Sequence, residues 1–350
     1  MKTRRIALVS ALAAVAAAVP AAPAMAGGDV KVMTRNLYLG ADIIQLADLS
    51  GTQTVDTFKA NASAMWKTVQ TTNFPKRAPA LAKEIKSAKP DLVGLQEASL
   101  WRTGPNSSAP ATQVKYDFTA ELLKALKKEG VEYKVVVSQD EFDFEAPTLE
   151  QDVRLTQRDV ILKRKNGSKV KTGKTSKGQY SSANTLVVPT AVGPATSERG
   201  WVAVDASIGG SKFKFVNTHF EAYDLPPGLR ARQAAELVAG PLSGNAKTAV
   251  VLGDFNSGPA QMGTSGDAYR TVIGAGFTNI WGTRTDVRTI GRDELLDKQD
   301  GSEFIDQITY RPAASFTVKS KKVVGNSPFS KSIPKWSSDH NGVTATLRLK

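Results

Sequence analysis

The sequence contains no cysteine and only two histidines, and these shortages exclude several kinds of site. Without cysteine the chain can form neither a disulfide framework nor a thiolate-bound zinc or iron–sulfur centre, and it has no thiol nucleophile. Two histidines cannot build a three-histidine metal site. Any metal site must therefore rest mainly on carboxylate and amide oxygens, which are ligands of hard cations.

The sequence also lacks long hydrophobic runs, apart from one at its N-terminus. Residues 1–5 are rich in basic side chains, residues 6–19 are apolar and rich in alanine, and Ala24-Met25-Ala26 has the small-x-small pattern of a cleavage site. This layout predicts a secretory signal peptide at residues 1–26, because the apolar run is shorter than the ~20 residues of a membrane anchor, the alternative interpretation. We expect a secreted, extracellular protein with no integral membrane segment after residue 26.

Positive charge is in excess: 46 lysines and arginines face 33 acidic residues, giving a net charge of +13. Such a balance favours anionic partners such as nucleic acid, phospholipid headgroups or other phosphate esters. Solubility alone explains it equally well.

Short apolar runs recur along the chain, each followed by polar residues, and their length and β-branched content predict strands. The expected strands cover residues 30–33, 92–95, 133–137, 159–162, 213–216, 248–252 and 343–347. Helical spacing and stop signals predict helices over residues 78–88, 118–129 and 230–239. Residues 160–206 are typical of consecutive strands, with a hairpin at Asn166-Gly167. The alternation of strands and helices favours a single α/β domain over residues 27–350.

Residues with catalytic chemistry follow several of these runs. They are Asn36, Glu97 after Leu95-Gln96, His219 after Asn217-Thr218, Asp254 and Asn256 in Gly253-Asp254-Phe255-Asn256, Asp306, and Asp339-His340. Taken singly, each is explained as well by a turn or a cap. Together they place both histidines at strand ends beside carboxylates or amides. Because ligands of open α/β sheets bind at strand ends, the pattern favours one shared site.

In this order the motifs resemble those of the endonuclease/exonuclease/phosphatase superfamily, metal-dependent phosphoesterases with a deoxyribonuclease-I-like fold. The resemblance runs from Met33-Thr34-Arg35-Asn36-Leu37 to Ser338-Asp339-His340 and so covers nearly the whole chain after residue 26. It implies an α/β four-layer sandwich of two face-to-face mixed β-sheets flanked by helices. It also implies a hydrolase that attacks a phosphate ester with water.

The resemblance also assigns a metal site. Glu97 matches the family position that holds the divalent cation, with Asn36 and Asp339 close by. The ion it implies is Mg²⁺, with Mn²⁺ or Ca²⁺ as alternatives. A hard cation with oxygen ligands can neutralise phosphoryl oxygens and a departing alkoxide.

The catalytic positions follow in the same way. His340 matches the family's catalytic histidine, and Asp306 matches the carboxylate that orients it. Asp254 and Asn256 match residues that position or deprotonate the attacking water and bind the phosphate. The resemblance leaves open whether His340 or Asp254 takes the proton.

Three further positions complete the expected site. A histidine at position 219 occurs in the secreted deoxyribonuclease, sphingomyelinase and inositol-phosphatase branches, and we expect His219 to be the general acid. We expect Asn217 and Arg158 to contact the substrate phosphate. For Arg158, an ion pair with Asp159 or another neighbour is the alternative. Tyr38 stands where the repair branch places a second acidic residue, so a second metal is in doubt.

The substrate is less well defined. The net charge and His219 favour a nuclease-type phosphodiesterase. The alternatives are a lipid phosphodiesterase of the sphingomyelinase or phospholipase C type, an inositol-phosphate-type phosphatase, and a non-catalytic binding protein that keeps the fold. Residues 163–177 hold seven basic residues and no acid, which suits either a phosphate-tracking surface or a lysine-protected sheet edge. We expect Trp101, Phe142, Phe144 and Trp336 to lie in the core, and we expect a monomer.

Overall fold

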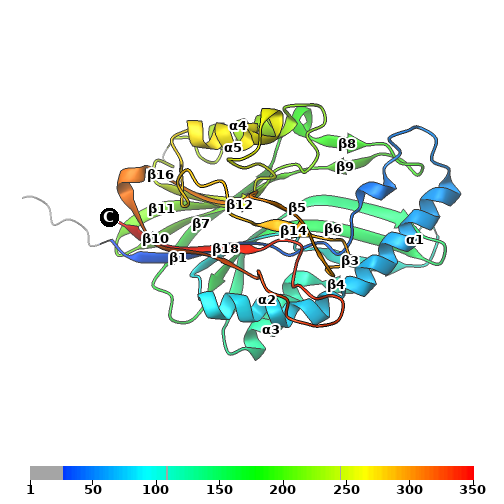
Figure 1. The fold of residues 1–350 in the computed structure, drawn as a ribbon, viewed down its shortest axis with the longest axis horizontal. Helices are drawn as coiled ribbons and strands as arrows, with labels where there is room; N and C mark the ends of the chain where they lie inside the picture. Colours follow the sequence, from blue (N-terminus) through cyan, green and yellow to red (C-terminus); the bar gives the residue numbers. More distant parts are fainter. Residues whose placement is uncertain (1–26, 108, 245) are drawn as a thin grey trace, which may run out of the picture.

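The strands of the protein form two large mixed sheets that pack face to face (Figure 1). We describe them from a computed structural model that covers residues 27–107, 109–244 and 246–350. The expected signal peptide at residues 1–26 lies outside the described residues.

Within these residues the first sheet has ten strands, and its order is β17-β18-β1-β2-β6-β5-β9-β8 with β3 and β4 attached to β6. Its strands are β1 (Asp29–Asn36), β2 (Leu92–Gln96), β3 (Leu100–Gly104), β4 (Gln113–Asp117), β5 (Tyr133–Pro147), β6 (Asp152–Arg164), β8 (Leu186–Val188), β9 (Ala195–Ser197), β17 (Phe316–Val324) and β18 (Gly342–Leu349). β1 and β2 run parallel at its centre, and the other pairs are antiparallel.

The second sheet has six described strands in the order β13-β16-β12-β11-β10-β7. They are β7 (Lys171–Gln179), β10 (Gly200–Ile208), β11 (Ser211–His219), β12 (Ala249–Asp254), β13 (Thr278–Asn279) and β16 (Asp306–Arg311), and β11 and β12 are its parallel pair. A separate pair, β14 (Ile290–Arg292) and β15 (Gln299–Glu303), lies at the strand ends.

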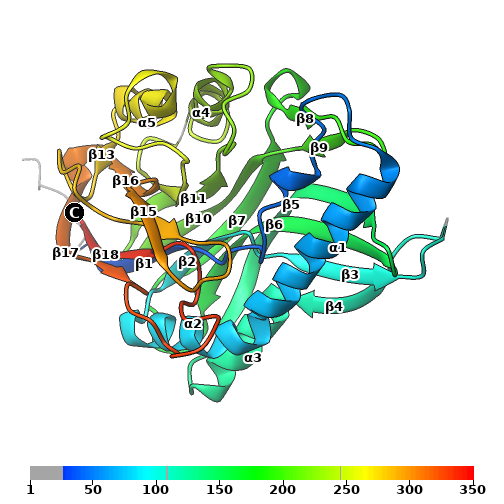
Figure 2. The same cartoon turned by 45° about the vertical axis from the view of Figure 1, so that its right-hand side comes forward.

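Helices cover the outer face of each sheet, and the views of Figures 1 and 2 agree on this arrangement. α1 (Val55–Thr72), α2 (Phe74–Ala88) and α3 (Phe118–Lys128) pack on the first sheet, and α4 (Leu229–Ala239) and α5 (Asp267–Gly274) pack on the second. Single turns of 3₁₀ helix are η1 (Ile44–Leu46), η2 (Ser182–Asn184), η3 (Gly263–Gly266) and η4 (Ala313–Ser315).

Three apolar clusters separate these four layers, and strand alternation explains how one strand serves two of them. On β12, Val250 and Leu252 point between the sheets, whereas Ala249 and Val251 point to α4 and α5. On β2, Leu92 points between the sheets, whereas Val93 and Leu95 point to the helices on the other side. The expected four-layer sandwich of two face-to-face mixed β-sheets flanked by helices is thus confirmed.

Local sequence explains where the first helices begin and end. The Thr54 side chain accepts a hydrogen bond from the Thr57 N–H and caps α1. Asn73 then ends α1 in the left-handed conformation (φ 41°) and caps α2 through its side chain, which accepts from the Lys76 N–H. Asp117 caps α3 in the same way. Asx and hydroxyl side chains at these positions satisfy N–H groups that have no partner inside the helix.

All three expected helices are present, as are the seven expected strands. The prediction of a hairpin at Asn166-Gly167 is wrong. β6 belongs to the first sheet and β7 pairs with β10 in the second, so this turn connects the two sheets. Helices α1 and α5 were not expected. The apolar face of α1 contains the small residue Ala62, and five threonines and asparagines dilute its pattern.

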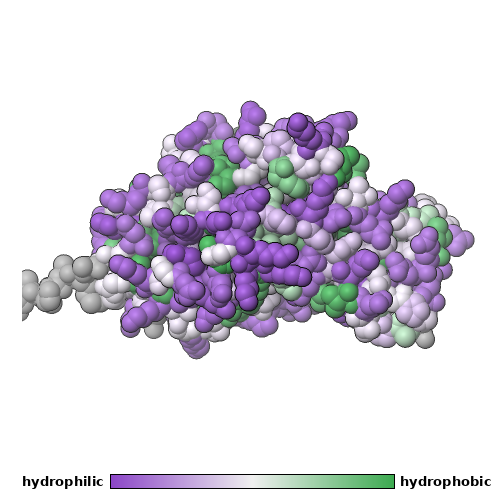
Figure 3. Space-filling view, turned by 90° about the horizontal axis from the view of Figure 1, so that it is seen from below, coloured by the Kyte–Doolittle hydropathy of each residue, from purple (hydrophilic) through white to green (hydrophobic). Residues whose placement is uncertain are grey.

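The outside of the molecule is mostly polar where Figure 3 shows it, with hydrophobic residues only scattered over that face. Among the described residues, no helix combines the length and the apolar character that a bilayer span requires.

Candidate active site

The expected site residues of the first sheet lie together at one edge. β1 and β2 are parallel neighbours whose last residues, Asn36 and Gln96, are in register. Glu97 therefore follows beside Asn36. His340 lies in the segment that enters β18, and its carbonyl oxygen accepts a hydrogen bond from Arg35 at 2.8 Å.

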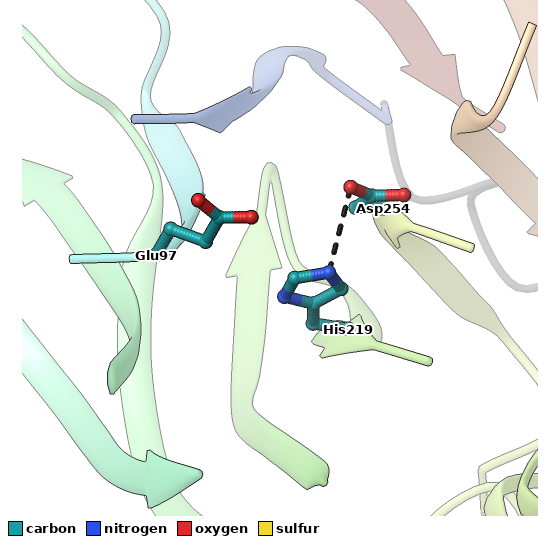
Figure 4. Close-up of side chains that lie close together, drawn as sticks. All are labelled: Glu97, His219 and Asp254. Carbon is teal, nitrogen blue, oxygen red and sulfur yellow. Dashed lines mark ion pairs between the residues drawn. The ribbon is translucent and has the colours of Figure 1, made fainter. Parts of the chain in front are cut away.

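The second sheet contributes its own strand ends to the same place. His219 and Asp254 end the parallel strands β11 and β12 in register with each other, and Asp306 begins β16 opposite Asp254. Figure 4 shows the Glu97 side chain reaching across from the first sheet toward His219 and Asp254. The edge at which both sheets end thus gathers one set of carboxylates and imidazoles.

Asp254 lies at the centre of this set. Its Oδ2 atom is 3.5 Å from Nε2 of His219 and 3.6 Å from Nε2 of His340, and it accepts a hydrogen bond from Nδ2 of Asn36 at 3.0 Å. Burial, together with the charge of Asp306 and against the opposing charge of His340, raises the pKa of Asp254 to about 7. A carboxylate with such a pKa can accept a proton from water near neutral pH.

His340 is surrounded by carboxylates. Its Nδ1 atom is 2.8 Å from Oδ2 of Asp306, and its Nε2 atom is 3.6 Å from Asp254 and 3.9 Å from Oδ1 of Asp339. Burial lowers the pKa of His340, but the carboxylates raise it more, so the pKa lies well above its usual value. These carboxylates favour the imidazolium form of His340.

Glu97 offers carboxylate oxygens opposite the histidines. Its Oε1 accepts from Asn36 Nδ2 at 2.9 Å, and its Oε2 accepts from the Leu39 N–H at 2.7 Å. Burial and the charge of Asp339 raise the pKa of Glu97. Ligand atoms of Glu97, His219 and Asp254 lie within 4.8 Å of one another.

This donor set fits a hard divalent cation. Glu97 and Asp339 repel each other across the site, and a cation between them would relieve that repulsion while taking oxygen ligands. Asn36 hydrogen-bonds both Glu97 and Asp254, so it orients the carboxylates that face the ion. Glu97 would hold the cation together with the oxygens around it: Asp254 lies within ligand distance of Glu97, and Asn36 and Asp339 are the further ligands expected from the sequence.

The backbone is strained at two of these positions. Glu97 has φ 54° and Asn256 has φ 46°, a region that costs a residue with a side chain on the order of 1–3 kcal/mol. In β12, position 253 must be glycine (φ 147°), because a Cβ there would lie 1.8 Å from the Thr218 carbonyl oxygen. The strand ends keep this geometry because the surrounding sheet fixes it, as is common where side chains must point into a site.

His219 is held differently from His340. Its Nδ1 atom is 2.8 Å from Nη1 of Arg199 and 3.3 Å from Nε2 of Gln157. A guanidinium only donates, so Nδ1 of His219 must accept and cannot carry a proton. Burial first, then the charges of Arg199 and His340, lower the pKa of His219 well below its usual value. The proton-donor role expected for His219 requires an imidazolium, and this environment opposes it.

The two expected asparagines have different surroundings. Asn256 lies in the site, with Nδ2 3.1 Å from Nε2 of His219 and 3.0 Å from the Phe220 carbonyl oxygen. Asn217 is completely buried between the sheets, where it donates to the Leu95 carbonyl oxygen at 2.9 Å and contacts Gln96. Asn217 is therefore placed behind the site as a bridge between β2 and β11, and its expected phosphate contact lacks support.

Arg158 also lies away from the cluster. Its guanidinium donates to the Ala98 carbonyl oxygen at 2.8 Å and to Oδ1 of Asp117 at 2.7 Å. The alternative of a structural ion pair is the better description, with Asp117 rather than Asp159 as partner. Its donors are directed at the β2–β3 connection, so the expected phosphate contact of Arg158 is not supported.

Sequence reasoning missed two buried arginines that fix the site loops. Arg35 donates to the Asn36 and His340 carbonyl oxygens at 3.0 and 2.8 Å, and Arg77 donates to the Leu37 and Ser337 carbonyl oxygens at 2.6 and 2.9 Å. Both side chains are completely buried. The role of Arg35 could have been suspected from its position, because it is a charged residue inside the motif Thr34-Arg35-Asn36. The amphipathic pattern of α2 gave no sign that Arg77 is buried.

A pocket of about 480 Å³ opens at the cluster, and Glu97, His219, Asp254, Asn256, Asp339 and His340 all line it. Phe142 and Phe144, expected in the core, are half-buried and line the same pocket, whereas Trp101 is buried as expected. Trp336 is half-buried beside Arg292.

The two packed sheets and the carboxylate–histidine cluster at their common edge define a phosphoesterase of the deoxyribonuclease-I-like fold, a phosphoric ester hydrolase. Residues 61–340 match the sequence model of the Endonuclease/Exonuclease/phosphatase family, and the chain belongs to that family. Members of this family generally depend on divalent metal, in agreement with the acidic and histidine groups gathered here.

Solved structures with the same fold include an endonuclease/exonuclease/phosphatase family protein from Bacteroides thetaiotaomicron (TM-score 0.58, 17% identity, 93% of this chain and 99% of that chain). They also include the mannosyl-6-phosphatase Bt3783 of Bacteroides thetaiotaomicron VPI-5482 (TM-score 0.54, 18% identity, 91% and 99%). A third is D. rerio TDP2 complexed with single strand DNA product (TM-score 0.51, 16% identity, 91% and 98%). No curated protein matches the sequence.

Proposed function

We propose that the protein is a divalent-metal-dependent phosphodiesterase in which water attacks phosphorus directly. The observation that carries this proposal is the position of Asp254, whose Oδ2 atom lies within 3.6 Å of Nε2 in both His219 and His340 while Glu97 faces it across the pocket. A base, two imidazoles and a candidate cation site thus line one pocket.

Asp254 is the general base in this proposal. It is buried, its pKa is raised to about 7, and Asn36 fixes the orientation of the oxygen that faces the histidines. His340 cannot take this role as an imidazolium. Its Nε2–H instead donates to a phosphoryl oxygen, and Asp306 stabilises the positive charge from the other side of the ring.

His219 acts as a neutral hydrogen-bond donor. With Nδ1 occupied by Arg199, its proton is on Nε2, the atom that faces the carboxylate of Asp254. Both imidazole Nε2 atoms lie on the same side as the base. Beside the base, they donate hydrogen bonds to the phosphoryl oxygens.

We assign the departing oxygen to the side of Glu97 and Asp339, in line with the attacking water. Glu97 and its neighbouring oxygens would hold the divalent cation, which would supply positive charge for the departing alkoxide and the phosphoryl oxygens. Mg²⁺ is the ion proposed, since the donors are oxygens, and Mn²⁺ or Ca²⁺ are the alternatives. In this scheme the water proton goes to Asp254 while the new phosphorus–oxygen bond forms and the old one breaks, and the departing alkoxide takes its proton from solvent water.

Two further proposals come from the sequence. The signal-peptide pattern of residues 1–26 supports secretion. The net charge supports a nuclease-type activity. The solved structures with this fold include both a mannosyl-6-phosphatase and TDP2, so they do not favour one substrate class.

The test is hydrolysis by purified residues 27–350 with Mg²⁺ or Mn²⁺ of plasmid DNA, RNA, sphingomyelin, an inositol phosphate and methyl p-nitrophenyl phosphate, side by side. We expect chelation to abolish turnover. His340→Ala and Glu97→Ala should each reduce it by roughly 10²-fold or more, while the proteins remain folded. The exposed Glu150→Ala is the matched control for Glu97. Wild-type rates in the first two variants would refute the proposal.

A further inference from the structure

The active-site pocket continues beyond the catalytic cluster into an apolar part. Its floor is formed by two paired strands: Phe142, Phe144 and Ala146 of β5 face Gln157, Leu155 and Val153 of β6 in register. All six side chains line the pocket because alternate residues of a strand point to the same face. We call the space over Phe142, Phe144, Ala146, Leu155 and Val153 the apolar chamber.

The chamber begins at the catalytic cluster and leads away from it. Gln157, the polar member of the β6 row, lies 3.3 Å from His219. Leu155 and Val153 follow along the strand, so Val153 lies roughly 13 Å from Gln157. Polarity thus falls steadily with distance from the reacting centre.

The other walls are apolar as well. On the β8–β9 hairpin, Leu186, Val188 and Ala195 line the chamber, whereas the intervening Val187 is 56% exposed and faces away. The roof consists of residues after β1 and of α1, including Leu39 and Met65. Figures 1 and 2 both show the β1–α1 connection, in blue, beside β5, β8 and β9.

Hydrogen bonds fix the roof to the elements beside the chamber. Nε1 of Trp101 donates to the Leu39 carbonyl oxygen at 2.9 Å, and Tyr38 donates its hydroxyl to the Glu294 carbonyl oxygen at 2.7 Å. A preformed apolar space of this size is favourable for a ligand group that leaves water on entering it.

Charge around the pocket disfavours a polyanion. Outside the catalytic cluster the described lining carries the acidic residues Asp42, Glu221, Asp293, Glu294 and Asp300. Arg199 and Arg292 are the cations of this lining, and Arg199 is paired with Glu221 at 3.2 Å. A nucleic acid, which brings several phosphates, would meet repulsion here.

Much of the basic segment 163–177 lies far from the site, although Lys177 is in register with Val202, whose partner Asn217 is two residues before His219. Lys163 is in register with Leu92 at the start of β2, and Lys171 is in register with Ser207 at the far end of β10. Lys212, the neighbour of Ser207 on β11, is roughly 23 Å along the strand from His219. Since β7 is the edge strand of its sheet, the lysines are better explained as protection of that edge.

We propose that the apolar chamber binds an alkyl or acyl arm of the substrate, and that the substrate is an amphiphilic phosphate ester. Its phosphate lies at Asp254 and Glu97, and its hydrocarbon arm extends past Gln157 over Leu155 and Val153. This inference rests on the proposed function and specifies its substrate class. The closing experiment measures binding and turnover separately, so that each can fail alone.

The binding probes are methyl-, butyl- and octylphosphonate below their aggregation concentrations, titrated calorimetrically into residues 27–350 with Mg²⁺. Each buried methylene can add up to about fourfold in affinity. We expect octylphosphonate to bind at least about 100-fold more tightly than methylphosphonate. Equal affinities for the two probes would overturn the inference.

Two neighbouring residues on β9 supply a matched pair of variants. Ala195→Phe fills the chamber and should reduce the octyl-to-methyl affinity ratio at least about tenfold. Thr196→Phe adds the same ring on the other face of the strand and should keep the wild-type ratio. Val153→Thr, which conserves shape and adds a hydroxyl to the chamber, should reduce the ratio if Ala195→Phe does not fold. A ratio unaffected by both chamber variants would overturn the inference.

Turnover separates the two proposals. Hydrolysis of methyl p-nitrophenyl phosphate without any dependence of binding on chain length would leave the proposed function standing and remove the chamber's role. Chain-length-dependent binding without turnover of any ester would count against the proposed function alone. Plasmid cleavage that is faster than ester hydrolysis and insensitive to Ala195→Phe would overturn the amphiphilic substrate in favour of nucleic acid.

Discussion

Nδ1 of His340 lies 2.8 Å from Oδ2 of Asp306, although these residues belong to different sheets. Asp306 begins β16 and is completely buried, and its own N–H donates to Oγ1 of Thr289 at 3.0 Å. The contact holds a proton on Nδ1 and leaves Nε2 facing Asp254. A carboxylate behind the ring thus sets both the orientation and the charge of the imidazole in front.

Asp306→Asn tests this relationship, because an amide keeps the shape and removes the charge. We expect kcat to fall by roughly 10²–10⁴-fold with folding intact. Loss of the negative charge also lowers the pKa of His340. Since His340 acts as the imidazolium, the alkaline limb of the kcat profile should move to lower pH.

The readouts are rates across pH on methyl p-nitrophenyl phosphate and thermal unfolding. Asp286→Asn, at an exposed ion pair with Arg284, is the control and should leave both rate and profile unchanged. An Asp306→Asn protein with wild-type kcat at all pH values would show that the Asp306 charge has no part in the reaction.

Glu97→Gln tests the cation site with a readout that needs no turnover. A ligand that binds only the folded protein stabilises it, by about 2.7 kcal/mol at a concentration of 100 Kd. We therefore expect Mg²⁺ or Mn²⁺ to raise the Tm of the wild-type protein and a chelator to reverse the rise. In Glu97→Gln the rise should largely disappear, whereas in Glu150→Gln it should persist. Identical metal-dependent Tm shifts in all three proteins would place the ion elsewhere.

The sequence was sufficient to predict the layers and most of the strand-end cluster. Asn36, Glu97, His219, Asp254, Asp306 and His340 each end or border a strand, and parallel neighbours end at one edge, so their convergence follows from local patterns. The order of the motifs along the chain then pointed to the fold that joins the two sheets.

What failed was the position of individual side chains relative to the site. Asn217 shares the face of β11 that carries Phe215 and His219, but it lies deeper between the sheets, where Gly94 leaves room for it: a Cβ on Gly94 would lie 2.6 Å from Asn217 Oδ1. Arg158 pairs with Asp117 across 41 positions of sequence. Such contacts depend on how two layers meet, which periodicity along one strand does not encode.

The apolar chamber escaped prediction for the same reason. Phe142 and Phe144 have the sequence signature of core residues, and they do pack at the edge of the first apolar cluster. Whether such a face is covered or left open depends on where the β1–α1 connection lies. That connection is a loop with one short 3₁₀ turn, for which sequence gives no position.

Arg199→Gln tests why His219 is neutral. Arg199 approaches Nδ1 of His219 to 2.8 Å, and its charge, with burial, holds the pKa of His219 well below the usual value. Removing the guanidinium should raise this pKa. As the pH falls, His219 of the variant should therefore gain a proton at a higher pH than His219 of the wild type. We expect kcat to fall by on the order of tenfold or more, because the neutral ring is then no longer held in the tautomer that presents Nε2–H to the phosphate.

NMR of the imidazole nitrogens in metal-free protein gives the answer directly, since the sequence has only two histidines. Arg154→Gln, which removes a partly exposed arginine paired with Asp143, is the control and should leave both imidazole titrations unchanged. The same titration of His219 in Arg199→Gln and wild type would mean that burial alone keeps this ring neutral.

Arg35 connects the two ends of the chain at the site, and its removal should affect stability and catalysis together. The guanidinium is completely buried, is 3.0 Å from Glu84, and donates to the Asn36 and His340 carbonyl oxygens and to Oγ of Ser337. Breaking a buried pair from one side commonly costs about 3–5 kcal/mol, so Arg35→Met should lower the free energy of unfolding by about that amount. Urea denaturation gives this quantity.

Two comparisons isolate the role of Arg35 in placing His340. Arg348→Met, at an exposed ion pair with Asp29, should cost less than about 1 kcal/mol. Glu84→Gln removes the acidic partner but leaves the bonds from Arg35 to the two carbonyl oxygens, so it should destabilise the protein while preserving most of kcat. Arg35→Met, measured well below its unfolding temperature, should lose at least about tenfold in kcat because the segment carrying His340 loses its attachment to β1. If Arg35→Met and Glu84→Gln lost the same small share of kcat, the arginine would stabilise the fold without placing the histidine.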